Sequence, residues 1–304
     1  MTNKLNIKIK SFLCALLLLA TIVLPLASCG GNVKQVETDS NGFIFTLSDD
    51  GSYYVLSGCK NKVEELVVPS SYNGLPVKEI GNDAFYQDSD LRSVVIPDSI
   101  EAIHHNAFYE CKNLANITFP NSIKFIGTNA FYKTAFLIDE SNREDGVLYI
   151  GNILVAANRN IAGEYTVKEG TSSIASGAFT GCAALTSVVL PESLTYIGTY
   201  AFYGCAALEK INFPSKLHTI DAFAFDGCKV LNNITIPASL KKIGHYAFQN
   251  CTVLTKATFE VTSGWKRYYN GVFASVIREK NLSNISTAGR YLAITFNDSE
   301  WIHK

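Results

Sequence analysis

The sequence predicts an α/β solenoid, mostly β with short helical turns, which winds right-handed through about eight units of 23 residues. The first observation is the dipeptide Ala-Phe, which recurs in phase with steps of 23, 23, 48, 23, 23 and 23 residues from Ala84-Phe85 to Ala247-Phe248. The second is that prolines and cysteines keep the same step. A fixed period of this length is the signature of a repeat architecture, in which each unit contacts mainly its neighbours. The phased residues are Pro97, Pro120, Pro191, Pro214 and Pro237, and Cys111, Cys182, Cys205, Cys228 and Cys251.

Each unit follows the pattern I-G-x-x-A-F-x-x-C-x-x-L-x-x-I-x-F-P-x-S-L-x-x, as in Leu208-x-x-Ile211-x-Phe213 for its strand. This L-x-x-L-x-L core is typical of leucine-rich repeats, and 23 residues lie within their usual length. Alternation at its end indicates a strand with side chains pointing inward and outward in turn, which proline then stops. We expect the A-F-x-x-C segment to form a short helical or 3₁₀ turn with Phe and Cys buried. The corner glycines, such as Gly244, suit a bend where backbones lie close together.

The units resemble the BspA-like leucine-rich repeats of bacterial surface proteins. The resemblance covers nearly everything from Phe43 onward, and the 48-residue step fits the irregular unit with which this family interrupts its arrays. Lys168 stands where that unit usually has proline. The resemblance implies an extracellular binding protein that adheres to host matrix, host cells or other bacteria.

The first 28 residues read as a secretory signal. Lys4, Lys8 and Lys10 precede an apolar run that ends in Leu26-Ala27-Ser28-Cys29, which resembles the bacterial lipobox. In that family the cysteine is acylated after cleavage, so we expect Cys29 to carry a lipid that holds the protein to the cell envelope. The alternatives are an uncleaved anchor and an ordinary signal peptide with a chance cysteine.

The remaining chain divides into four predicted parts. Residues 29–42 are polar and should form a flexible tether. Residues 43–76 read as a hairpin cap, because terminal repeats must cover an open apolar face. Residues 77–260 hold the repeats, with the irregular unit near 137–170, and residues 261–304 form a C-terminal cap.

The net charge and the motifs argue against nucleic-acid binding, metal binding and catalysis. A net charge of −1 lacks the basic face that nucleic acid requires. No cysteine or histidine spacing matches a metal site, and no nucleophile elbow or paired acid and base supports catalysis. We therefore expect no enzyme, no cofactor and no metal. The cysteine column is best explained as packing, although neighbouring cysteines at the strand spacing of about 4.8 Å could form ladder disulfides.

Two surfaces are candidates for binding. The first is the outward row of the strands, which carries hydrogen-bonding and apolar side chains. The second is a tyrosine column after Ala-Phe, which forms either a stacking strip for glycans or half-buried packing beside the phenylalanines. The strand row comprises Arg92, Val95, Thr118, Val189, Lys210, Asn212, Thr235, Lys256 and Thr258, and the column comprises Tyr86, Tyr109, Tyr132 and Tyr203.

Adhesion is the first functional hypothesis, with extracellular proteins or glycans as partners, a monomeric chain, and membrane contact through the lipid alone. The rivals are a glycan-binding accessory lipoprotein and a structural envelope protein. A cluster of exposed aromatic side chains would favour glycan binding.

Overall fold

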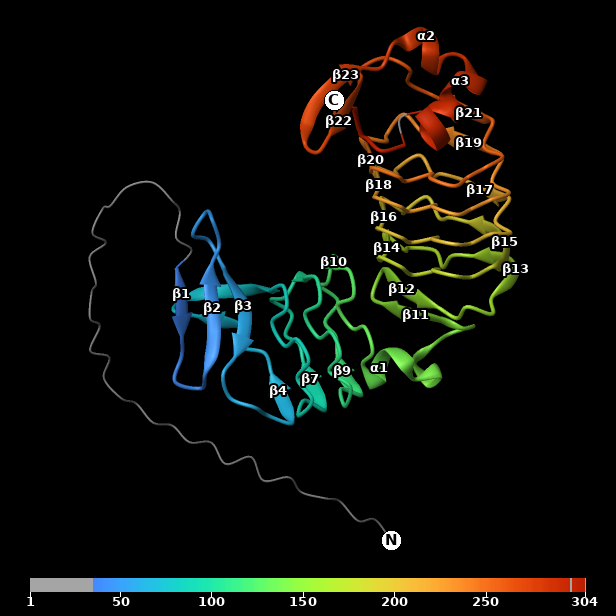
Figure 1. Ribbon diagram of the computed structural model, residues 1–304. Coiled ribbons are helices and arrows are strands. Elements are labelled where there is room, and N and C mark those ends of the chain that lie inside the picture. The colour runs from blue at the N-terminus through green and yellow to red at the C-terminus, as the bar shows by residue number, and fades with distance from the viewer. Residues whose placement is uncertain (1–34, 296, 304) are drawn as a thin grey trace. The chain divides into compact units, whose positions relative to one another are not determined.

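The computed structural model describes residues 35–295 and 297–303, so the predicted signal and Cys29 lie outside the described residues. Within them the chain forms a β-solenoid of about nine turns with 23-residue spacing, which confirms the predicted fold class. Two rows of parallel strands run along it, and Figure 1 shows them clearly in the C-terminal repeats, where even- and odd-numbered strands lie on opposite sides. No helix among these residues is long and apolar enough to cross a membrane.

The row after the proline is made of two-residue strands that follow a longer first strand in each block, β6 in the first and β12 in the second. In the first block of repeats β8 pairs in parallel with β6, and β10 pairs in parallel with β8. In the second block β14, β16, β18 and β20 follow β12 in the same way. The inward side chain of each two-residue strand is a buried isoleucine, which is the second apolar residue after the proline, as Ile103 is in β8. The bounds are β6 Leu75–Ile80, β8 Ala102–Ile103, β10 Phe125–Ile126, β12 Ile153–Ala157, β14 Ser173–Ile174, β16 Tyr196–Ile197, β18 Thr219–Ile220 and β20 Lys242–Ile243.

The leucine-rich row forms three separate parallel sheets, β4-β7-β9, β13-β15-β17 and β19-β21. Register follows the repeat, so that Val67, Val95 and Thr118 stand side by side. The row is therefore interrupted at the irregular unit and again after β17. The bounds are β4 Glu65–Val67, β7 Ser93–Val95, β9 Asn116–Thr118, β13 Ala162–Thr166, β15 Ala184–Val189, β17 Lys210–Ile211, β19 Asn233–Ile236 and β21 Lys256–Phe259.

The N-terminal end is covered by antiparallel strands. The predicted hairpin is present as β2 (Phe43–Leu47) and β3 (Tyr54–Cys59), and β3 continues in parallel to β6. A strand β1 (Val36–Thr38) pairs with β2 inside the segment expected to be a flexible tether, so that expectation is wrong for these residues. Pairing satisfies their backbone groups, which a polar composition alone does not reveal. A short β5 (Ser71–Tyr72) turns back onto β6.

The Ala-Phe segment is a pair of turns and not a helix, which corrects the local expectation. In the second unit, Ala107 N–H donates to His104 O and Cys111 N–H donates to Phe108 O. The third residue of each turn, Asn106 or Glu110, has a φ near +55°. A left-handed residue at that position is the mark of a type II turn and stops helical propagation. The same two positions are left-handed in all seven units.

Stacked phenylalanines and cysteines form the centre of the core. The rings of Phe179, Phe202, Phe225 and Phe248 lie 5.0 to 5.2 Å apart and within 6° of parallel. Each column cysteine from Cys111 onward is buried and unpaired. The Cys205 thiol donates to Phe179 O at 3.1 Å, and Cys228 and Cys251 repeat this contact. The column is thus packing with a hydrogen bond, and not a ladder of disulfides.

Burial makes these thiols resistant to ionisation. It raises the pKa of Cys111 to about 11 and that of Cys205 to about 12. Since thiolate is the reacting species, we expect iodoacetamide at pH 8 to label the partly exposed Cys59 rapidly and the five column cysteines only after unfolding. Peptide mapping by mass spectrometry reads out each site, with a denatured sample as the control. Rapid labelling of Cys205 in the native protein would contradict the packing.

The same burial links stability to pH. An unfolded thiol releases its proton from about pH 8.5 upward, whereas folded Cys111 keeps it to about pH 11. The unfolded state then binds fewer protons, so the free energy of unfolding falls as pH rises through this window. Below it, this contribution is fully present. Urea unfolding at successive pH values across the window measures the fall.

An irregular unit separates the two blocks of repeats. It begins with the helix α1 (Ala135–Ile138) and the 3₁₀ turn η1 (Glu140–Asn142), followed by a hairpin of β11 (Val147–Ile150) and β12. Successive β12 side chains enter different cores, Ile153 and Val155 the first and Leu154 the second. Alternation along a strand buried on both sides explains this division.

The C-terminal end is closed by the chain itself. The strand β24 (Glu300–His303) pairs antiparallel with β20 and with β22 (Trp265–Tyr269), which continues to β23 (Val272–Val276). Two short helices, α2 (Glu279–Leu282) and α3 (Ile285–Arg290), and the π-helical turn η2 (Tyr291–Thr295) lie between them. Trp265 and Trp301 are both buried under this cap.

Candidate functional site

The predicted strand row is exposed along its whole length. All nine of its residues are exposed, with Val95 and Val189 at 44% and 40%. Register brings Thr235 beside Thr258 on neighbouring strands. The three sheets split the row into segments, so it offers several short surfaces and not one continuous strip.

Two members of the row already have partners. The Asn212 side chain accepts from Leu190 N–H at 2.9 Å and donates to Leu190 O at 3.1 Å, replacing the ladder contact that β17 lacks beyond Ile211. Arg92 pairs with Glu64 at 3.4 Å in full exposure, a contact of small energy. Lys210 and Val189 line a shallow hollow of about 420 Å³.

The tyrosine column is brought together only in part. Tyr86, Tyr109 and Tyr132 stack with ring centroids 5.0 and 5.1 Å apart. Tyr203 lies in the other block and instead meets Tyr200 edge to face at 5.5 Å. Because the stacked rings cover one another's faces, mainly their edges and hydroxyls remain outside. The geometry therefore disfavours sugar stacking on this column and suits protein contacts, in which tyrosine edges are common anchors.

A second aromatic row escaped the sequence reasoning. Tyr200, Phe223 and Tyr246 stack at 4.8 and 5.0 Å, each with a φ between 55° and 58°. Bulky residues rarely adopt this left-handed conformation, and other units place Asp, Asn or Gly there. The signal was the unusual residue type at a fixed position of the repeat, just before Ala.

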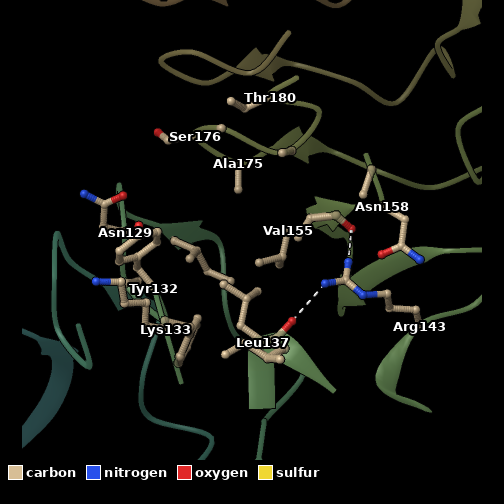
Figure 2. Close-up of a pocket in the computed structure, with 18 of the residues that line it drawn as sticks. Asn129, Tyr132, Lys133, Leu137, Arg143, Val155, Asn158, Ala175, Ser176 and Thr180 are labelled. Atoms are coloured by element: carbon tan, nitrogen blue, oxygen red, sulfur yellow. Dashed lines mark hydrogen bonds between the residues drawn. The ribbon is translucent and has the colours of Figure 1, made fainter. Parts of the chain in front are cut away.

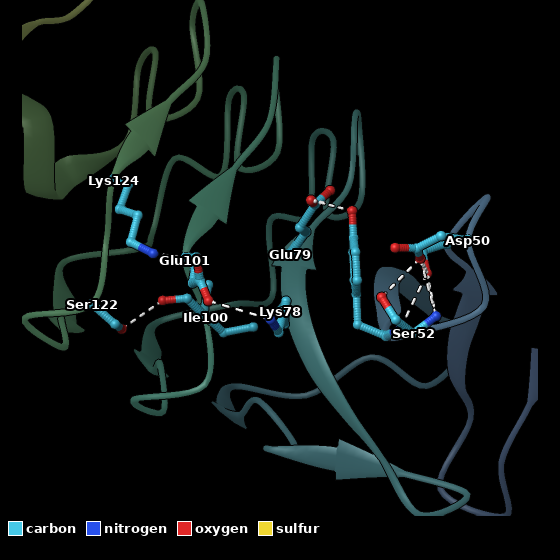
Figure 3. A network of polar contacts seen from close by, with 10 residues as sticks. Asp50, Ser52, Lys78, Glu79, Ile100, Glu101, Ser122 and Lys124 are labelled. Atoms are coloured by element: carbon cyan, nitrogen blue, oxygen red, sulfur yellow. Dashed lines mark hydrogen bonds and ion pairs between the residues drawn. The ribbon is translucent and has the colours of Figure 1, made fainter. Parts of the chain in front are cut away.

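A network of polar contacts links the β6, β8 and β10 side of the first block (Figure 3). Glu101 lies between Lys124 at 2.5 Å and Lys78 at 3.6 Å, and the hydrogen bond from Lys124 lowers the pKa of Glu101. Ser122 donates to Ile100 O at 2.6 Å. These contacts repeat at about one turn of the solenoid and join neighbouring units, so we assign them to the fold.

A cavity lies beside the irregular unit (Figure 2). It has a volume of about 600 Å³, with one wall from residues 126–133, an opposite wall from residues 175–180, and further lining from residues 137–143 and 155–159. Sequence reasoning missed it. The signal was the absence of an in-phase Ala-Phe between Phe131 and Phe179, since Ala135-Phe136 falls outside the 23-residue period.

Arg143 lines this cavity with its side chain nine-tenths buried. Its guanidinium donates to Leu137 O at 2.8 Å and to Ala156 O at 3.4 Å, while Nε has no hydrogen-bond partner. Glu140 lies 3.9 Å from that nitrogen. Arg159 and Lys133 also line the cavity, so cations outnumber the single lining carboxylate. No group of His, Cys, Asp and Glu within the described residues could hold a metal ion.

Comparison with protein families gives a match to the family described as "BspA type Leucine rich repeat region". Six copies of its model match, over residues 78–184 and 172–289. These ranges span most of the described chain and include the irregular unit. A search among curated proteins gives no significant match.

Solved structures of several leucine-rich-repeat proteins are similar to this chain. A leucine-rich-repeat protein of T. pallidum is 27% identical, with 72% of this chain and 90% of that chain covered and a TM-score of 0.39. A leucine rich cell surface protein of Faecalibacterium prausnitzii is 20% identical, with 76% and 96% covered and a TM-score of 0.31. The pneumococcal vaccine antigen PcpA is 17% identical, with 77% and 84% covered and a TM-score of 0.34.

Proposed function

Since the chain belongs to the BspA-type leucine-rich-repeat family, we propose that it is a surface lipoprotein that binds extracellular proteins and thereby adheres to host matrix, host cells or other bacteria. The observation that carries this proposal is the exposed strand row. It presents valines, threonines and lysines on three short sheets and no facing pair of carboxylates. Such a surface can make apolar and hydrogen-bonded contacts with a partner, but it does not offer the paired acid and base that catalysis needs.

The stacked tyrosines support a protein partner over a glycan. Tyr86 and Tyr132 are 45% and 42% exposed, yet the ring planes of Tyr86 and Tyr109 differ by only 4°. A sugar needs an open ring face, whereas a protein partner can use the ring edge and hydroxyl. The proposal includes a monomeric chain that is held to the membrane through a lipid on Cys29.

We expect the purified chain to bind at least one component of an array of extracellular matrix proteins and glycans. The double change Val95→Asp and Val189→Asp should weaken that binding at least tenfold, because it places charge in a contact surface. Val272→Asp is the matched control, since Val272 is exposed on β23 outside the strand row. If the array detects any glycan binding, that binding should survive a change of the tyrosine column to Ser.

No binding on the array, or binding that survives the strand-row change, would overturn the assignment of this face. Glycan binding lost with the tyrosine column would favour the glycan-binding rival. Mass spectrometry of the N-terminal peptide from the producing cell checks the anchor, and an unmodified Cys29 would remove that part of the proposal.

A further inference from the structure

The cavity beside the irregular unit is the space of a missing Ala-Phe turn. In five of the seven units, three N–H groups of this turn donate to carbonyls of the next unit. In the first unit, Asp83, Phe85 and Gln87 do so at 3.0, 2.8 and 2.7 Å. Between Phe131 and Phe179 no Ala-Phe turn follows, because the irregular unit has the hairpin β11-β12 instead.

The third unit is therefore left with free donors. Within the described residues, the N–H groups of Asn129, Phe131 and Lys133 have no hydrogen-bond partner, although their equivalents in the two preceding units are all paired. Facing them across the cavity are the turn residues 176–180. There Ala157 N–H donates a hydrogen bond to Ala178 O at 2.7 Å. Ser176 O and Thr180 O accept no hydrogen bond from the described residues.

The last unit has the same open edge, and there the chain itself fills part of it. Tyr246 N–H donates to Asn297 O, which belongs to the C-terminal tail, whereas Phe248 N–H and Asn250 N–H have no partner among the described residues. The tail thus pairs one of the three donors of the final turn, whereas none of the three at residues 129–133 is paired, and these face a cavity.

We propose that this cavity binds a short extended peptide segment of a partner protein that carries an acidic side chain. Donors two residues apart on one wall, with carbonyls on the other, match the alternating groups of an extended backbone, the arrangement used when a peptide is added to a sheet edge. A volume of about 600 Å³ lies within the range of ordinary ligand pockets.

The charges of the cavity favour an acidic side chain on the bound peptide. The Arg143 side chain is nine-tenths buried, and its Nε has no hydrogen-bond partner and lies 3.9 Å from the Glu140 carboxylate. Arg159 is exposed and makes no ion pair within the described residues, while Lys133 pairs with Glu110 at 2.6 Å. A carboxylate between the two arginines would gain charge-assisted hydrogen bonds. Leu137, Val155 and Ala175 supply apolar walls for the rest of the segment.

A substitution at Thr180 can block the cavity with a residue type that already occurs at this position of the repeat. It occupies the column position where four other units carry tyrosine, Tyr203 among them, so Thr180→Tyr fits the local backbone while filling the space opposite Tyr132. Gln249→Tyr makes the same change at the same position of the last unit, outside the cavity. Arg159→Glu removes the acid preference, with the exposed Lys229→Glu as its control.

The test selects a displayed library of random heptapeptides on the full chain and measures the dissociation constants of the enriched peptides. We expect enrichment of Asp and Glu, a loss of at least tenfold in affinity with Thr180→Tyr and with Arg159→Glu, and no change with either control. Hydrogen exchange at the amides of Asn129, Phe131 and Lys133 should slow when peptide binds. Hydrogen exchange reports directly on the backbone N–H groups. A purely electrostatic effect of Arg159 would therefore not slow the exchange of these three amides.

Several outcomes would overturn the proposal. These are no enriched peptide, peptides that bind Thr180→Tyr as well as the parent, or unchanged exchange at the three amides. A dimer in sedimentation that Thr180→Tyr dissolves would show a second copy of this chain as the occupant, against the proposal. This binding does not need the strand row, so Val95→Asp with Val189→Asp should leave it intact, and the two proposals can fail separately.

Discussion

Replacing Phe225 by alanine should lower the free energy of unfolding by about 3–5 kcal/mol, the largest effect expected of a single change in this chain. Phe225 is fully buried and stacks on Phe202 at 5.1 Å and on Phe248 at 5.2 Å. Phe213 meets it edge to face at 5.6 Å. Its loss opens a cavity between three consecutive turns, which rigid backbone ladders on both sides prevent from closing.

Urea unfolding followed by far-ultraviolet circular dichroism measures this effect, and tryptophan fluorescence reports separately on the C-terminal cap. Because each repeat contacts mainly its neighbours, we expect the second block, residues 171–259, to lose stability more than the first. Phe273→Ala is the control: Phe273 is 52% exposed on β23, and its truncation should change the unfolding free energy by about 0.5 kcal/mol or less. Equal effects of the two changes would contradict the stacked core.

Gly244→Ala should destabilise the protein strongly for a different reason. A Cβ on Gly244 would overlap Ala222 N and would lie 2.6 Å from Asp221 C. Both are backbone atoms of the preceding turn, so relief requires the two turns to move apart and breaks the short strand pairing between them. We expect a loss of about 1–3 kcal/mol or more, as for an overpacked core.

A series at the same repeat position tests this explanation. A Cβ added at Gly127 would come within 2.5 Å of its nearest backbone atom and one at Gly198 within 2.7 Å, whereas at Gly81 the nearest atom would be the Val55 side chain at 3.2 Å. The loss of unfolding free energy on changing each glycine to alanine should therefore decrease from Gly244 to Gly127 to Gly198 to Gly81. None of the four has a positive φ, so backbone strain does not contribute, and a flat series would refute the steric cause.

These glycines show where sequence reasoning was right about a position and silent about its cause. The repeat marked a corner where backbones approach, and the structure confirms the close approach. The left-handed residues are elsewhere, two per unit, and include Tyr200 and Glu110. Tyrosine and glutamate rarely adopt that conformation, so their residue types carry no signal for it.

The sequence by itself determined the solenoid, its 23-residue period, the inward rows and the burial of the cysteine column. These follow from local spacing, which repeats identically in each unit and so needs no knowledge of distant contacts. It also predicted the exposed strand row residue by residue, although not the breaks between its sheets.

Only the tertiary structure decided the arrangement of the segments that depart from the repeat. The strand β1, the separation of Tyr203 from the other tyrosines, and the cavity beside residues 129–133 all depend on partners far apart in the sequence. The open donors of Asn129, Phe131 and Lys133 are backbone groups, which every residue but proline possesses. Whether such a group is paired depends on the neighbouring turn, and the composition of its own turn does not reveal it.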